Sequence, residues 1–211
     1  MDNWSKIRNI YCIGRNYRLH ALELGNVVPN EPLVFMKPSH AASAMSGGVI
    51  RIPGKQGEVH FELEVVLRMG RAYEPGTDPH ACIEGMTLGL DLTLRDVQSK
   101  LKAKGQPWLP AKGFQQSAPL GQWLPYPGEK ELQEHTFTLY RNGLAAQQGC
   151  VRDMLFPVAE LIHYVGTHYG LGEGDLLFTG TPAGVAALAD GDKLQLLWGE
   201  QELGSCTIEI V

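Results

Sequence analysis

This chain of 211 residues lacks several features that assign proteins to common functional classes. It has no run of basic residues and its net charge is −5. We therefore expect no nucleic acid partner, because phosphate backbones are bound mainly through Lys and Arg. No apolar segment comes near the roughly 20 residues that span a bilayer, so we expect no membrane partner either. The N-terminal residues lack the charged and then apolar pattern of a secretory signal, which favours a cytoplasmic location.

Cysteine-based and serine-based sites are also disfavoured. The four cysteines are scattered without a CxxC pair, so we expect reduced thiols rather than a disulfide framework or a zinc site. The Gly-x-Ser-x-Gly motif of the α/β-hydrolases and the His-Glu-x-x-His zinc motif are both missing. The length suits one hydrophobic core, and we predict a single domain over residues 1–211.

Short β-like runs dominate the sequence and are separated by many of its 25 glycines and 13 prolines. We predict strands over residues 7–13, 33–37, 60–68, 86–94, 136–140, 175–179, 193–198 and 205–211. Asn142-Gly143 predicts a hairpin turn, and residues 199–202 predict another. Helical periodicity covers residues 16–24, 94–104 and 154–169. This order favours an α+β fold, with a mixed β-roll or barrel-like sheet and short inserted helices, over a doubly wound sheet.

An acidic strand pattern is the most informative motif. In His60-Phe61-Glu62-Leu63-Glu64 the side chains of a strand would alternate, which places the two glutamates side by side. Two carboxylates this close repel each other unless a cation lies between them, and oxygen ligands favour Mg²⁺, Mn²⁺ or Ca²⁺. The alternative is a solvated edge strand that carries two surface glutamates.

A third carboxylate, Asp91, follows the apolar run 86–90. It could complete an open octahedral site that leaves positions for a substrate, or it could be a polar residue at a strand-end turn. Arg95 and Gln98 lie one turn into the following helix and could face the same site. Asp96 is better explained as an acid in the first turn of that helix.

Two further segments carry residues suited to catalysis. Lys112 precedes an aromatic segment and could contact a substrate carboxylate or an oxyanion, or it could be a solvated lysine. His20 and Glu23 would share a face of a helix, where the carboxylate would orient the imidazole as a general base for water. The alternative is a surface pair without a function. Glycines on both sides suggest that residues 14–26 form a lid.

A Gly- and Thr-rich segment, Thr179-Gly180-Thr181-Pro182, follows the apolar run 175–178. It could present hydroxyl and N–H groups to an anion, or it could be a tight turn. It is not a P-loop, because the Gly-Lys-Ser/Thr ending is missing.

Taken in order, these segments resemble the fumarylacetoacetate hydrolase family, and most closely its small single-domain acylpyruvase-like and isomerase- or decarboxylase-like members. The resemblance is carried by Gly14-Arg15-Asn16-Tyr17 with His20 and Glu23, Glu31-Pro32-Leu33-Val34-Phe35-Met36-Lys37-Pro38, residues 60–64, residues 90–98, Gly105-Gln106-Pro107-Trp108 with Ala111-Lys112, and Thr179-Gly180-Thr181-Pro182 with Gly184-Val185. Each motif is moderately specific, but together they keep the family's order and span nearly the whole chain. The main departure is Phe61, where some relatives carry a second histidine.

The resemblance implies a homodimer and a divalent metal ion, usually Mg²⁺ or Mn²⁺, held by Glu62, Glu64 and Asp91. It also implies that His20 and Glu23 activate water from a lid helix. The other matched positions contact substrate or stabilise an oxyanion: Lys112 as a catalytic residue, and Arg15, Arg95, Gln98 and Thr181 as substrate-binding residues.

The activity expected from these parts is metal-dependent hydrolysis of a carbon–carbon bond in a small 2,4-dioxo acid. Such an acylpyruvate, for example acetylpyruvate or fumarylpyruvate, would give pyruvate and a carboxylic acid. The same site would also suit an oxaloacetate decarboxylase or a 2-hydroxyhepta-2,4-diene-1,7-dioate isomerase. A non-catalytic module that binds an oxo acid is a further alternative, although such a module needs no general base. The sequence leaves open the natural substrate, the metal, the pathway and the dimer geometry.

Overall fold

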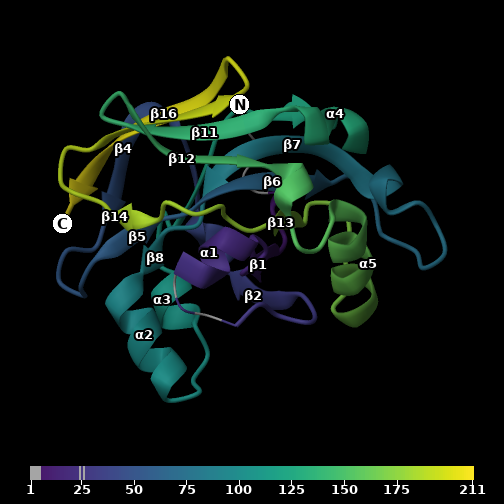
Figure 1. The fold of residues 1–211 in the computed structure, drawn as a ribbon, viewed down its shortest axis with the longest axis horizontal. Coiled ribbons are helices and arrows are strands. Elements are labelled where there is room, and N and C mark those ends of the chain that lie inside the picture. The colour runs from purple at the N-terminus through teal and green to yellow at the C-terminus, as the bar shows by residue number, and fades with distance from the viewer. Residues whose placement is uncertain (1–5, 24, 26) are drawn as a thin grey trace.

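The computed structural model describes residues 6–23, 25 and 27–211. Its strands form three sheets with short helices around them (Figure 1), so the expected α+β fold with a mixed sheet is confirmed. Within the described residues, no helix is both long and apolar enough to cross a membrane.

The largest sheet runs in the order β2-β1-β13-β6-β7-β9-β3, and β10 pairs with β7. Its strands are β1 (Ile10–Gly14), β2 (Leu33–Lys37), β3 (Ala42–Ala44), β6 (Leu63–Met69), β7 (Ile83–Leu90), β9 (Ala118–Leu120), β10 (Leu124–Pro125) and β13 (Leu176–Phe178). The sheet is mixed, because β1 is antiparallel to β2 and parallel to β13.

Two smaller sheets complete the β structure. The first runs β12-β11-β15-β16-β4 and the second runs β14-β5-β8. Their strands are β4 (Ser46–Ile52), β11 (Thr136–Arg141), β12 (Leu144–Cys150), β15 (Lys193–Trp198) and β16 (Gln201–Ile210), and then β5 (Val59–Phe61), β8 (Thr93–Leu94) and β14 (Ala186–Ala187).

The helices are short and lie at the margins of the sheets. They are α1 (Arg18–Glu23), α2 (Arg95–Ala103), α3 (Leu109–Lys112), α4 (Glu129–Glu134) and α5 (Val158–His168), with 3-10 turns η2 (Ser39–Ala41), η3 (Pro79–Cys82) and η4 (Val151–Asp153). Figure 1 shows α1 near the middle of the view, with α2 and α3 beside it at the lower left and α5 apart on the right. Helices α2 and α3 both contact β8 of the small sheet.

Alternating side chains of the central strands belong to two different hydrophobic clusters. Tyr11 and Ile13 of β1 belong to the main cluster, whereas Ile10 and Cys12 belong to a smaller one. Successive residues of a strand point to opposite faces, so both faces of the large sheet are covered at its centre. Polar side chains at the ends of these strands therefore stand on a rigid support.

Two expected strands are each broken at an acidic residue. The strand expected over 60–68 is β5 and β6 with Glu62 between them, and the strand expected over 86–94 is β7 and β8 with Asp91 in the break. The expectation of continuous strands is wrong because β5 and β8 leave the large sheet and pair with each other. The N–H of Asp91 donates to the carbonyl of Glu62 at 2.8 Å, so the two breaks adjoin.

Other expected elements need smaller changes. The strands over 33–37 and 193–198 are confirmed as β2 and β15. Asn142 and Gly143 have φ values of 53° and 82°, which suit the predicted hairpin turn. The helix over 154–169 begins only at Val158, because a residue that precedes a proline, here Pro157, avoids helical geometry. The helix over 16–24 is α1, and Leu24 lies outside the described residues.

Candidate functional site

Three carboxylates meet where the large sheet adjoins the small one. Glu62 lies between β5 and β6, Glu64 is the second residue of β6, and Asp91 follows β7. One oxygen atom of each residue lies within 4.8 Å of the corresponding oxygens of the other two. All three side chains are buried. The alternative of a solvated edge strand is therefore excluded for this motif.

Lys112, the last residue of α3, directs a buried ammonium group into this acidic cluster. Its Nζ donates to Glu62 Oε2 at 2.8 Å and also donates to Asp91 Oδ2. The same Nζ lies 4.8 Å from the centre of the Phe35 ring. Lys112 is thus a buried cation within the cluster and not a solvated surface lysine.

A second buried lysine, Lys37 at the end of β2, contacts Asp91 and the backbone beside the cluster. Its Nζ donates to the carbonyl of Leu92 at 3.1 Å, to Ser117 Oγ at 3.2 Å and to the carbonyl of Lys112. It also lies 2.8 Å from Asp91 Oδ1. An ammonium group has three N–H bonds, and here they point to three other acceptors. The contact with Asp91 is consequently an ion pair without a directed hydrogen bond.

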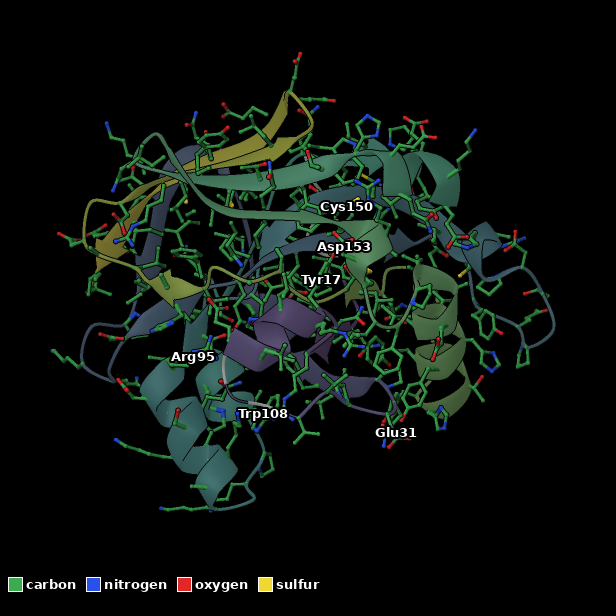
Figure 2. All side chains as sticks on the ribbon, in the orientation of Figure 1. Tyr17, Glu31, Arg95, Trp108, Cys150 and Asp153 are labelled. Atoms are coloured by element: carbon green, nitrogen blue, oxygen red, sulfur yellow. The ribbon has the colours of Figure 1, made fainter. Side chains whose placement is uncertain are left out.

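Helix α2 contributes two more polar side chains. Arg95 donates through Nη2 to Glu62 Oε1 and through Nη1 to Gln98 Oε1, the latter at 2.8 Å. Residues three apart on a helix share a face, so both side chains approach the acidic cluster from the same side. Figure 2 labels Arg95 and Trp108, which line one pocket, on the side of the molecule where α1 and α2 lie.

Helix α1 brings the predicted pair of His20 and Glu23 to the same region. His20 is buried, and its Nδ1 lies 3.5 Å from Glu23 Oε2. The carboxylate of Glu23 also accepts from the N–H of Gly184, with distances of 3.1 and 3.2 Å to its two oxygens. Glu23 therefore connects α1 to the loop after β13, and the isolated surface pair is excluded.

The electrostatic surroundings shift the pKa values of Glu62 and Glu64 in opposite directions. Burial by itself raises the pKa of Glu62, but the charges of Lys112 and Arg95 outweigh it, and the pKa ends below its usual range. Burial also raises the pKa of Glu64, and the nearby carboxylates of Asp91 and Glu62 raise it further, well above the usual range. The same acidic cluster raises the pKa of Lys112 despite the opposing effect of burial.

His20 differs from the carboxylates in the direction of its shift. Burial lowers the pKa of its imidazole, and the charges of Glu62 and Glu23 offset this only in part, so the pKa ends below 6.5. A neutral imidazole held beside a carboxylate is chemically suited to accept a proton near pH 7.

The donor set fits a hard divalent cation. The converging ligands are carboxylate oxygens, which Mg²⁺ and Mn²⁺ prefer. Asp91 Oδ1 is buried and accepts no hydrogen bond from the described residues. Burial raises the pKa of Glu64, and the negative charges of Asp91 and Glu62 raise it further. A divalent ion among Glu62, Glu64 and Asp91 would satisfy both features.

A pocket opens over this cluster, and almost every predicted site residue lines it. Its lining includes Arg15, His20, Glu62, Glu64, Asp91, Arg95, Gln98, Lys112 and Thr181. The cavity has a volume of about 30 Å³. Glu23 reaches the pocket through its contact with His20. His60, which precedes the two glutamates in the same motif, is outside the lining of this pocket, and its Nε2 lies 3.0 Å from Glu58 Oε2.

Two supporting residues were missed by the sequence analysis. Lys37 stands in a quoted motif but had no assigned role. Gln147 of β12 accepts from the N–H of Leu63 at 2.8 Å and donates to Thr181 Oγ1 at 2.9 Å. It therefore holds the backbone between the two glutamates and the hydroxyl that lines the pocket. Its sequence surroundings carry no signal for this, since the contacts span 84 and 34 residues.

Comparison with known proteins settles the family. The profile described as "Fumarylacetoacetate (FAA) hydrolase C-terminal" matches residues 9–211. The chain belongs to the fumarylacetoacetate hydrolase family. The oxaloacetate tautomerase YcgM of Escherichia coli (strain K12) is 38% identical over 202 residues, which cover 93% of this chain and 91% of that protein. The mitochondrial oxaloacetate decarboxylase of Dictyostelium discoideum is 36% identical and covers 91% and 89%.

A solved structure of the same family supports both the fold and the metal chemistry. The fumarylpyruvate hydrolase from Pseudomonas aeruginosa, in complex with Mn²⁺ and pyruvate, superposes with a TM-score of 0.87. It is 32% identical and the match covers 97% of this chain and 90% of that one. Members of this family thus carry names for both oxaloacetate and acylpyruvate chemistry.

Proposed function

We propose that this protein is a divalent-metal-dependent enzyme that interconverts the enol and keto forms of oxaloacetate or of a closely related short 2-oxo diacid. The observation that carries the proposal is the buried acidic triad with an ammonium and a neutral imidazole in the same pocket. Relatives named for oxaloacetate support this substrate over an acylpyruvate, which the motifs had favoured.

The proposed reaction moves one proton and leaves the composition of the substrate unchanged. From enol to keto, the enol O–H bond breaks and a C–H bond forms at the carbon between the 2-oxo group and the second carboxylate. We assign His20 as the group that takes up or delivers this proton, because its lowered pKa keeps it neutral and Glu23 orients its ring.

Other side chains would stabilise the negative charge that develops on the 2-oxygen while the proton moves. We assign this role to Lys112, whose raised pKa keeps it an ammonium. Arg95 and Gln98, joined by a hydrogen bond, would orient the first carboxylate. When bound to Glu62, Glu64 and Asp91, a divalent ion would supply Lewis-acid polarisation of the 2-oxo group.

Hydrolysis of an acylpyruvate is the second candidate. The observation that favours it is the pair of His20 and Glu23, because a neutral imidazole with a carboxylate partner can activate water. Hydrolysis would use the same metal ligands as tautomerisation but would give different products. Decarboxylation of oxaloacetate would also use the same metal ligands, and it would break a carbon–carbon bond to release CO2.

The deciding experiment follows the decay of enol-oxaloacetate by its ultraviolet absorbance with purified protein and Mg²⁺ or Mn²⁺. We expect a rate above the uncatalysed one that is lost on adding EDTA and in the Glu64→Gln variant. Glu58→Gln is the matched control, because Glu58 is exposed and bonds to His60 outside the triad. Proton NMR then identifies the products from oxaloacetate and acetylpyruvate. An enol decay unaffected by the enzyme would reject the proposal, and release of acetate and pyruvate from acetylpyruvate would favour hydrolysis.

A further inference from the structure

Two short segments each place an aromatic ring beside the buried ammonium group of the other. In β2, Phe35 and Lys37 are two residues apart and share a face of the strand. At the end of α3, Phe114 follows Lys112 by two residues. The Nζ of Lys112 lies over the Phe35 ring, 4.8 Å from its centre. The Nζ of Lys37 lies over the Phe114 ring, 6.0 Å from its centre.

The Phe35 ring is also in contact with the residue at which α3 begins. Its centre lies 5.6 Å from that of the Trp108 ring, with an angle of 56° between the two planes, and both side chains are half-buried. The carbonyl of Trp108 accepts from the N–H of Lys112 at 3.0 Å, one helical turn further on. Trp108 therefore contacts the ring with its side chain and fixes the lysine with its backbone.

The ring differs in kind from the other contacts of the Lys112 ammonium. Lys112 is 2% exposed and donates to Glu62 and Asp91, which belong to the acidic triad. A divalent ion on the triad would compete with the ammonium for these carboxylates, because it attracts the same kind of oxygen atom. The face of an aromatic ring attracts an ammonium group but offers no oxygen ligand to Mg²⁺ or Mn²⁺. The contact with Phe35 is therefore independent of what occupies the triad.

We propose that Phe35 is a positioning residue, which holds the ammonium group of Lys112 at the pocket through a cation–π contact. The catalytic consequence rests on the proposed function, in which Lys112 stabilises the charge that develops on the 2-oxygen. Burial of the ammonium strengthens the contact, because little water screens it. The 6.0 Å contact of Lys37 with Phe114 is at the outer limit of such an interaction, so we expect a smaller effect there.

The test replaces Phe35 by phenylalanines that carry one, two or three fluorine atoms on the ring. Fluorine withdraws electrons from the face of the ring and changes its shape little, so it weakens a cation–π contact in steps. The first readout is urea unfolding in EDTA, which needs neither metal nor substrate.

Two controls separate the cation–π contact from general effects of fluorine. The first is the same series at Phe35 in the Lys112→Met variant, which keeps the ring and removes the cation. The second is the series at Phe178, which belongs to the hydrophobic cluster that Phe35 packs against. Within the described part of the chain, no lysine or arginine lies over the Phe178 ring. If Lys112→Met does not fold, the comparison with Phe178 decides alone.

With Lys112 present, we expect the folding equilibrium constant to fall in steps, by about fivefold in total from phenylalanine to the trifluorinated ring at Phe35. Both control series should stay flat to within about twofold. The second readout is enol-oxaloacetate tautomerisation. Its kcat should fall by about fivefold along the Phe35 series while the KM stays within about twofold, because the ammonium acts on charge that develops in the transition state.

A Phe35 series as flat as that at Phe178, or one with the same slope in Lys112→Met, would overturn the cation–π contact. A trend in stability with an unchanged kcat would overturn the positioning role. The failure of the proposed function is distinguishable from these outcomes. It would appear in the wild-type protein as a lack of any acceleration of tautomerisation, and the unfolding series would still decide whether Phe35 holds the ammonium.

Discussion

Replacement of Lys37 by methionine tests whether a buried cation behind the acidic triad is required for stability. The side chain of Lys37 is 0% exposed and that of its partner Asp91 is 1% exposed. Methionine retains most of the apolar stem of lysine but removes the ammonium. The carboxylate of Asp91 would then lack its partner on the Oδ1 side, and three acceptors would lose the hydrogen bond that the ammonium donates.

The expected cost follows from the burial of these groups. Removal of one member of a buried ion pair costs roughly 3–5 kcal/mol, because the other charge is left without compensation. For a domain of this size, the loss corresponds to a fall in Tm of about 10 °C. Lys100→Met is the matched control, since Lys100 is exposed on α2, and we expect it to change the free energy of unfolding by less than about 0.5 kcal/mol.

The assay is urea unfolding in EDTA, followed by circular dichroism, with Lys37→Met, Asp91→Asn and the double variant. Because the two residues share one ion pair, the double variant should lose about 1–3 kcal/mol less than the sum of the single losses. If Lys37→Met were as stable as Lys100→Met, or if the losses were additive, the electrostatic explanation would be refuted.

Three further predictions concern the site. Because the pKa of Glu64 is raised in the folded protein, the metal-free protein should lose stability as the pH rises above the ordinary carboxyl range, and urea titrations should find this loss removed by Glu64→Gln. The lowered pKa of His20 should put the acid limb of kcat/KM below pH 6.5, and His20→Gln should lower the rate about a hundredfold and abolish the limb. A limb above 6.5 would contradict this. Gln147→Leu should weaken Mn²⁺ binding about tenfold by calorimetry, whereas the exposed neighbour variant Gln148→Leu should not.

Local sequence was sufficient for much of this protein. The strand periodicity and turn chemistry predicted β2, β15 and the hairpin at Asn142, because those features depend on residues adjacent in the chain. The acidic spacing of Glu62 and Glu64 also indicated a cation site, because two carboxylates two residues apart on a strand cannot avoid each other. The largely exposed β4 was missed, because it begins with Ser46-Gly47-Gly48 and only its last four residues carry a strand-like pattern.

Only the tertiary structure decided where these strands change sheets and what supports the acidic triad. The chain breaks at Glu62 because β5 pairs with β8 and β14 instead of continuing in the large sheet. No local pattern encodes which strands become the partners of β5. Lys37 contacts acceptors 55 to 80 residues away, and Gln147 contacts segments 84 and 34 residues away. The types of ligand were thus set by the sequence, whereas their convergence and the compensation of their charge were set by long-range packing.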